Sequence, residues 1–212
     1  LILRKPINIV GDPYWTEVFN KDVDGCGSDL DEYARRLVIC ALTYGHCHTL
    51  VDFPAPTEAR SLAEERALNR RPYWIEVDPT KVYGWRLDRE SNYGNLTQVR
   101  IGEKAVVADG EFGEKVYDQI RVIEPGRYRV YRQEEQKKAM QGNFPYPSSF
   151  DQSDATSEFE LVESGPYSLD QVPLVTIYAN KTDTMTSRPP LLDIAHLNLA
   201  HFQRQADLIH SL

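Results

Sequence analysis

Two cysteines and two histidines lie close together in the sequence and have the side chains needed to ligate a metal ion. They are Cys40, His46, Cys47 and His48. Residues 46–52 predict a strand, in which side chains alternate between two faces, so the histidines would share one face and Cys47 would point to the other. A structural zinc site needs four ligands that converge on one point. We therefore favour ordinary sheet residues and a buried cysteine, and expect no metal and no cofactor.

A hydrolytic site is the second possibility. Asp193 and His196 are three residues apart in a predicted helix and share one of its faces. A Ser-His-Asp hydrolase also needs a nucleophile on a strained turn, and the sequence has no GxSxG motif. Phosphate-binding glycine loops of the GxGxxG or Walker type are absent as well. The sequence therefore predicts no catalytic residue, and we expect that the protein is not an enzyme.

Contacts with other molecules are expected from two places. Arg127 and Arg129 share a face of a predicted strand with aromatic neighbours, which suits nucleic acid or an acidic partner, although a solvated strand face is the more ordinary interpretation. The last predicted helix has a side on which polar and apolar residues mix. The residues expected to make oligomer or channel contacts are Asn198, His201, Gln205, Leu208, Arg127 and Arg129.

Two helices have clear apolar periodicity. The first is expected to begin with Ser28 as N-cap and Asp31 in the capping-box position, and to end at Gly45. The last spans 191–212 after two prolines. Its clean stripe and its mixed side indicate contacts with two different partners. The clean stripe consists of Leu192, Ala195, Leu199, Phe202, Ala206 and Ile209.

The chain between these helices is dominated by short strands rich in β-branched and aromatic residues. A short polar helix over 57–69, a polar loop over 133–157 and an irregular lead-in over 1–27 complete the expected elements. The expected strands are 46–52, 73–77, 82–85, 96–101, 117–123, 127–131, 159–162 and 174–178.

These elements predict an α+β fold in which long helices flank a β-rich middle of short antiparallel strands. Three parts are expected: 1–52 with the lead-in, the capped helix and the first strand; 53–178 with the β-rich middle; and 179–212 with the start of a long helix. The chain begins with Leu1 rather than Met and ends within a predicted helix, so we expect a fragment of a larger subunit.

Composition narrows the function classes. The 212 residues carry a net charge of -8, and an acidic chain has no general attraction for phosphate, which disfavours tight DNA binding. An acidic wall could still face DNA that must slide past it. Three cysteines without a CxxC pair fit a reducing compartment better than a disulfide framework. No run approaches the roughly 18–20 apolar residues of a membrane span, so we expect no membrane contact.

Several sequence blocks, in this order, resemble the portal-like family of tailed bacteriophages, which is catalogued as a domain of unknown function. The resemblance extends through nearly the whole chain and is weakest over 88–170. Its most specific blocks are the one at residues 71–73 and the ones from residue 189 to residue 207. The blocks are Leu3-Arg4-Lys5-Pro6, Asp24-Gly25, Tyr44-Gly45-His46, Leu50-Val51-Asp52-Phe53-Pro54, Arg71-Pro72-Tyr73, Trp85-Arg86, Arg188-Pro189-Pro190-Leu191-Leu192-Asp193-Ile194-Ala195, Leu197-Asn198-Leu199-Ala200-His201-Phe202 and Ala206-Asp207.

The resemblance implies a portal-like core and a structural role. Identical subunits, usually twelve, would form a ring at one capsid vertex, made in the host cytoplasm and built into the virion. Double-stranded DNA would pass through the ring without sequence-specific binding. The implied partners are the major capsid protein, the packaging terminase and head-tail connector proteins. The helices would be wing-like or stem-like and the middle clip-like. The alternatives are a metal-dependent hydrolase or nuclease, and a different virion adaptor module.

Overall fold

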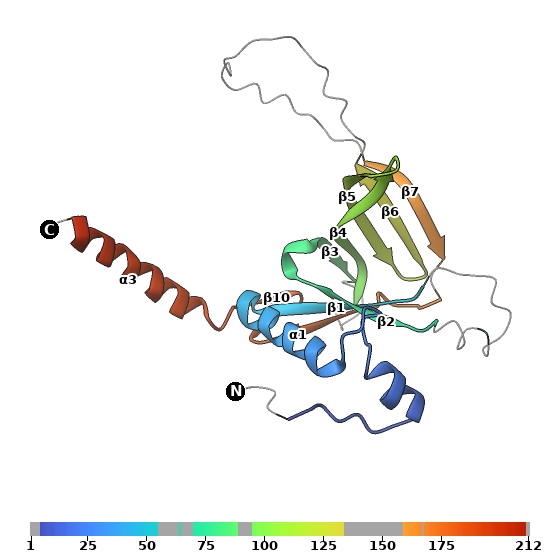
Figure 1. Ribbon diagram of the computed structural model, residues 1–212, viewed down its shortest axis with the longest axis horizontal. Coiled ribbons are helices and arrows are strands. Elements are labelled where there is room, and N and C mark those ends of the chain that lie inside the picture. The colour runs from blue at the N-terminus through green and yellow to red at the C-terminus, as the bar shows by residue number, and fades with distance from the viewer. Residues whose placement is uncertain are drawn as a thin grey trace, which may run out of the picture. The chain divides into compact units, whose positions relative to one another are not determined.

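The computed structural model describes residues 5–54, 64, 70–88, 95–133, 159–166 and 168–210. It is 28% helical and 43% strand, which confirms the mixed α+β class. The chain forms two compact units, one from residues 1–80 and 173–212 and the other from 81–172 (Figure 1). The expected division at 52 and 178 differs from this one, because strands at 73–77 and 174–178 both pair with the strand at 46–52.

The first unit is built on a three-stranded antiparallel sheet with the order β2-β1-β8. Helix α1 packs against this sheet, and a small hairpin, β9-β10, follows β8. The elements are η1 (a π-helix, Tyr14–Phe19), α1 (Leu30–Tyr44), β1 (His46–Asp52), β2 (Tyr73–Val77), β8 (Leu174–Tyr178), β9 (Lys181–Asp183), β10 (Thr186–Ser187) and α3 (Leu192–His210).

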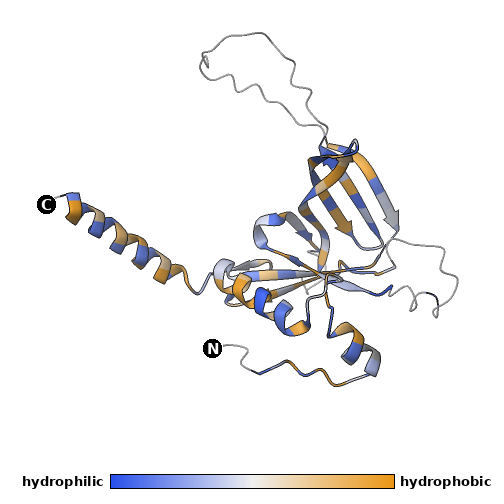
Figure 2. Cartoon of the chain, viewed as in Figure 1, coloured by the Kyte–Doolittle hydropathy of each residue, from blue (hydrophilic) through white to orange (hydrophobic). Residues whose placement is uncertain are grey.

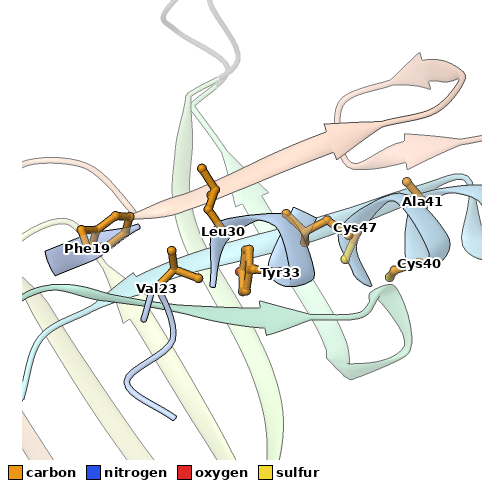
Figure 3. Close-up of a cluster of buried hydrophobic side chains, with 8 residues drawn as sticks. Phe19, Val23, Leu30, Tyr33, Cys40, Ala41 and Cys47 are labelled. Carbon is orange, nitrogen blue, oxygen red and sulfur yellow. The ribbon is translucent and has the colours of Figure 1, made fainter. Parts of the chain in front are cut away.

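The core of this unit lies between α1 and the sheet. Every third or fourth residue of α1 is buried, as expected for one apolar helix face. Burial of each large apolar side chain contributes about 1.5–3 kcal/mol, so this face fixes α1 on the sheet. The buried cluster consists of Phe19, Val23, Leu30, Tyr33, Leu37, Cys40, Ala41 and Cys47 (Figure 3).

Helix α1 begins one residue later than expected. Its N-cap is Asp29, whose side chain accepts a hydrogen bond from the Glu32 backbone N–H at 2.8 Å. The expected cap, Ser28, accepts instead from the Arg36 guanidinium at 2.9 Å. The helix ends as predicted at Gly45, whose φ of 91° is left-handed and whose N–H donates to Ala41.

The segment before α1 is tied down by two carboxylates. Asp31, expected in a capping box, accepts a hydrogen bond from the Ile7 backbone N–H at 2.7 Å. Arg71 is buried and pairs with Asp22, with 2.7 Å between Nη2 and Oδ2. A turn of π-helix at Tyr14–Phe19 replaces part of the irregular lead-in. These contacts explain how a segment with little secondary structure holds one position.

The second unit contains a five-stranded antiparallel meander in the order β3-β4-β5-β6-β7. Strands β4 and β5 pair from Val99↔Ile123 to Asp109↔Gly113, well past the point where β3 and β6 stop pairing with them. They are therefore longer than the sequence predicted and form a two-stranded ribbon. The elements are η2 (Pro79–Lys81), which leads in, then β3 (Val82–Leu87), β4 (Leu96–Asp109), β5 (Gly113–Glu124), β6 (Arg127–Gln133) and β7 (Phe159–Pro166).

The remaining expectations have mixed outcomes. The last helix is confirmed over the described residues 192–210. The polar helix expected over 57–69 and the loop expected over 133–157 lie outside the described residues, apart from Glu64 and Gln133. The hairpin β9-β10 was not predicted.

Candidate functional site

Helix α3 exposes apolar side chains over its whole length. Within the described residues, none of its side chains is buried. In Figure 2 hydrophobic and hydrophilic residues are interspersed along it. Most of the stability of a helix in a protein comes from packing of its apolar face, so this surface is the clearest candidate for contact with another molecule. Its large exposed residues are Ile194 at 64%, Leu197 at 71%, Leu199 at 55%, Phe202 at 69%, Leu208 at 63% and Ile209 at 67%.

The two sides expected for α3 follow from its helical geometry. At 100° per residue, the stripe containing Leu199 and Phe202 occupies one side. A second side carries Leu197 and Leu208, and a third is polar. Four contact residues were predicted on α3, and all of them are exposed and lie on the second side. They are Asn198, His201, Gln205 and Leu208. Their part in an interface stays a prediction.

The Asp193–His196 pair does not form a catalytic arrangement with a described nucleophile. Asp193 Oδ1 accepts a hydrogen bond from Arg188 Nη2 at 2.8 Å, on the segment that enters α3. His196 is exposed. The carboxylate therefore connects the start of the helix to the preceding segment.

The arginines expected to meet a partner, Arg127 and Arg129, are paired within their own sheet. Both bind the same carboxylate oxygen of Glu124, with 3.0 Å between Arg129 Nη2 and Glu124 Oε2. Partial burial raises the pKa of Glu124, but hydrogen bonds from Gln98 and Arg127 outweigh it and leave that pKa below its ordinary value. Much of the arginine charge is thus balanced locally, and their role as partner contacts stays a prediction.

The histidines of β1 share one face of the sheet, as predicted. His46 and His48 have their ring centroids 4.9 Å apart in an edge-to-face arrangement. His46 Nδ1 lies 2.7 Å from the Ser187 hydroxyl, which belongs to β10. His48 is buried, and its Nδ1 lies 3.0 Å from the Thr176 hydroxyl on β8. The histidines thus join β1 to the hairpin and to β8.

Burial weakens the basicity of both rings. It lowers the pKa of His46, and it lowers the pKa of His48 to about 4, with a further contribution from the neighbouring His46. At neutral pH both rings are therefore uncharged. An uncharged histidine beside a serine hydroxyl could act as the base that activates a nucleophilic serine. Such a pair also needs a carboxylate that orients the histidine, and among the described residues no carboxylate is hydrogen-bonded to His46. The hydrogen bond to Ser187 explains how the short β9-β10 hairpin is held.

The cysteines lie on the opposite face of β1 from the histidines, so the four-residue cluster of the sequence is divided between two faces. Cys40 and Cys47 instead approach Glu76 of β2, and the three donor atoms all lie within 4.8 Å of one another. Both cysteines are buried and neither is in a disulfide, and the remaining cysteine, Cys26, is exposed. Glu76 is 36 residues from Cys40, so spacing along the sequence could not have indicated it; antiparallel pairing of β1 with β2 brings it there.

An ion-pair network adjoins this face. Arg36 binds Asp24 at 3.0 Å and Glu76 at 3.3 Å. Partial burial raises the pKa of Asp24, but hydrogen bonds from Ser28, Cys26 and Arg36 lower it to about 2. The network therefore stays charged at neutral pH and connects α1 to β2 and to the preceding loop.

None of the described helices is long and apolar enough to cross a membrane. Neither the comparison with protein-family models nor the comparison with curated proteins finds a match for this chain.

Proposed function

We propose that this chain is the part of a tailed-phage portal subunit that packs against identical neighbours around a DNA channel at the capsid vertex. In this proposal the portal-like core comprises α1, the three-stranded and five-stranded sheets and α3. The subunits assemble into a ring in the host cytoplasm and enter the virion. The ring, commonly dodecameric, contacts the major capsid protein and docks the terminase and connector proteins.

The observation that carries the proposal is the exposure of α3. Phe202 and Leu199 lie on a stripe that would suit a helix core, yet they are 69% and 55% exposed. Each such side chain gains about 1.5–3 kcal/mol from burial, so several together strongly favour a covering surface. Identical copies around a rotation axis supply one, because each subunit then meets the next through complementary sides. Two sides of α3 are available for two neighbours.

Charge supports passage of DNA rather than capture. The chain has 32 acidic and 24 basic residues. Arg127 and Arg129, the basic pair expected near nucleic acid, share their charge with Glu124. Binding to duplex DNA draws most of its free energy from cationic side chains at phosphates, so a chain of this balance predicts weak, non-specific contact. Weak contact is what a translocation channel requires.

The test is assembly of the full-length protein that contains this chain. Mass photometry and negative-stain electron microscopy should show closed rings with rotational symmetry. Leu199→Glu combined with Phe202→Glu should shift the population to single subunits, because charge on the clean stripe opposes its burial. A protein that is monomeric at all concentrations would refute the proposal.

The matched control is Ala200→Glu combined with Gln203→Glu, which adds the same two negative charges to the polar side of the same helix. It should leave the rings intact. Rings that survive the Leu199→Glu, Phe202→Glu change would show that α3 does not mediate assembly.

The alternative of a metal-dependent hydrolase predicts loss of an activity on changing His46, His48 or Asp193. Each of these residues has a partner within the fold. His46 contacts Ser187 and His48 contacts Thr176, while Asp193 accepts a hydrogen bond from Arg188. These contacts favour structural roles for the three residues over catalytic ones. A different virion adaptor would give another ring symmetry or a one-to-one complex in the same images.

A further inference from the structure

We propose that Cys40, Cys47 and Glu76 form a binding site for a thiophilic divalent cation, best satisfied by zinc, on the helix-facing side of the first unit's sheet. The site is independent of the ring proposal, since it lies within one chain. It also differs from the metal site considered from the sequence, because neither His46 nor His48 contributes.

The donor geometry requires little movement. Zinc binds thiolate sulfur at about 2.3 Å and carboxylate oxygen at about 2.0–2.2 Å, so tetrahedral ligand atoms lie about 3.5–3.8 Å apart. The three donor atoms here are already within 4.8 Å of one another. Contraction by at most about 1.3 Å would close the site. Side-chain rotation alone supplies shifts of that size.

The scaffold holds the donors on three elements. Cys40 lies in the last turns of α1, and the left-handed Gly45 reverses the chain so that Cys47 follows in β1. Glu76 lies on β2 opposite Thr49, the residue two positions after Cys47 on the same face. Each donor is thus positioned by hydrogen-bonded backbone, which limits the ordering cost of binding a metal.

The environment suits a soft cation. Cys40 and Cys47 are 7% and 0% exposed, while the Glu76 side chain is 28% exposed. The buried sulfurs favour zinc over hard cations such as magnesium, which prefer oxygen ligands. The partly exposed carboxylate lies on the side that solvent reaches, where a water molecule or an added thiol could complete the coordination. Three protein ligands and one exchangeable ligand are a familiar zinc arrangement.

Charge is largely balanced at the site. Two thiolates and one carboxylate carry three negative charges and zinc carries two positive charges. Arg36, which also pairs with Asp24, partly offsets the remaining negative charge. Arg36 Nε lies 3.3 Å from Glu76 Oε2, so the guanidinium would orient the ligating carboxylate from outside. One residual negative charge beside a guanidinium costs much less to bury than several unpaired charges.

Metal binding would release two protons, one from each thiol, and would replace weak hydrogen bonds of the thiols, including the one between Cys40 and Cys47. The Cys47 thiol contacts the backbone carbonyl of Val77 at 3.8 Å, and the Cys40 thiol contacts that of His46 at 4.0 Å. Burial raises the pKa of Cys47, and the neighbouring Cys40 raises it further. Affinity for zinc should therefore increase with pH, because thiolate is the ligand.

The experiment measures metal binding to the reduced 212-residue chain under nitrogen. Cobalt(II) titration should produce thiolate-to-metal charge-transfer absorption that saturates at about one ion per chain, and zinc should displace cobalt. Competition with a chromophoric chelator then gives the zinc affinity. Cys40→Ser, Cys47→Ser and Glu76→Gln should each weaken zinc binding by about ten-fold or more, and each of the two cysteine variants should lose roughly half of the charge-transfer absorption per bound cobalt ion.

The control is Cys26→Ser, which removes the exposed cysteine and should bind zinc as the unaltered chain does. If Cys47→Ser does not fold, Cys40→Ser and Glu76→Gln still decide the matter. The proposal is overturned if the unaltered chain binds no stoichiometric metal, if Cys26→Ser abolishes binding, or if Cys40→Ser and Glu76→Gln bind like the unaltered chain. It is equally overturned if mass spectrometry finds a Cys40–Cys47 disulfide and no metal under reducing conditions.

Discussion

His48 on β1 and Thr176 on β8 are direct partners in the sheet, and their side chains meet with 3.0 Å between Nδ1 and Oγ1. The Thr176 hydroxyl in turn donates to the sulfur of Met185 at 3.2 Å. Because its proton is used there, Thr176 accepts from His48, which places the ring proton on Nδ1. Nε2 then carries a lone pair, and it is buried with no recorded hydrogen-bond partner among the described residues.

This arrangement predicts acid sensitivity in the first unit. The pKa of His48 is about 4 in the folded chain against 6.5 ordinarily, because burial and then His46 oppose its charge. As pH falls below 6.5 the unfolded chain takes up this proton first, so stability is full above pH 6.5 and declines toward pH 4. The decline should be about 3 kcal/mol at most. Urea unfolding across this range measures it.

His48→Gln should flatten the stability curve between pH 4 and 6.5. His201→Gln, on exposed α3, is the matched control and should leave the curve unchanged. An equally steep curve in His48→Gln would assign the acid sensitivity to other groups.

Arg36 predicts a second effect on stability. Removing its guanidinium by Arg36→Ala leaves Asp24 and Glu76 without their shared cation, and should cost about 1–2 kcal/mol after allowance for solvent screening. Arg35→Ala removes an exposed arginine from the same helix and should cost little. Chemical denaturation compares the two, and equal losses would contradict the role of the network.

The same network has its own pH dependence. The pKa of Asp24 is about 2 in the folded chain against 3.8 ordinarily. Its contribution is present above pH 3.8 and is lost as pH falls through 2. In Arg36→Ala that acid loss should be smaller, because one of the interactions that lower the pKa is gone. Unfolding curves between pH 2 and 4 in both proteins would show the difference.

Gly45 predicts a large cost for a small side chain. Its φ of 91° is strained for any other residue, and a Cβ there would lie 2.4 Å from Ser187 Oγ and 2.9 Å from the Arg188 backbone. Gly45→Ala should therefore destabilise the first unit by about 2–4 kcal/mol. Gly27→Ala, at a φ of 95° with nothing near its Cβ, should cost only the backbone strain, about 1 kcal/mol. Thermal unfolding measures the two variants. Equal losses of stability in Gly45→Ala and Gly27→Ala would mean that Ser187 moves away from the new Cβ at little cost.

Exposure of α3 predicts a difference in amide exchange between assembled and dissociated protein. In a single subunit, α3 lacks buried side chains and its amides should exchange faster than those of α1. In the proposed ring, α3 should become protected while α1 changes little. Hydrogen–deuterium exchange with mass spectrometry measures this. Protection of α3 in isolated subunits would contradict the prediction.

Local sequence predicted the elements whose stability comes from their own pattern. The spacing of Leu30, Tyr33 and Leu37 predicted α1, and the alternation in β1 predicted that His46 and His48 share a face. The N-cap was wrong by one residue because both Ser28 and Asp29 suit that position. Which of them caps depends on Arg36, about two turns farther along the chain, which donates a hydrogen bond to the Ser28 hydroxyl.

Features that depend on long-range packing could not be predicted. The hairpin β9-β10 has strands of three and two residues without apolar alternation, and it is fixed partly by Ser187, 141 residues from its partner His46. The approach of Cys40, Cys47 and Glu76 depends on strand register as well as on the turn at Gly45. Neither relationship leaves a spacing signal in one sequence.

Strand β1 pairs with β2 on one edge and with β8 on the other, and the whole second unit lies between those two partners in the chain. During synthesis on the ribosome, one edge of β1 would therefore remain without its partner strand until residue 178 has been synthesised. The meander of β3 to β7 pairs each strand with its neighbour and can complete itself earlier. The second unit can therefore fold before the first. Until β8 is made, the first unit exposes the unpaired edge of β1 to other chains.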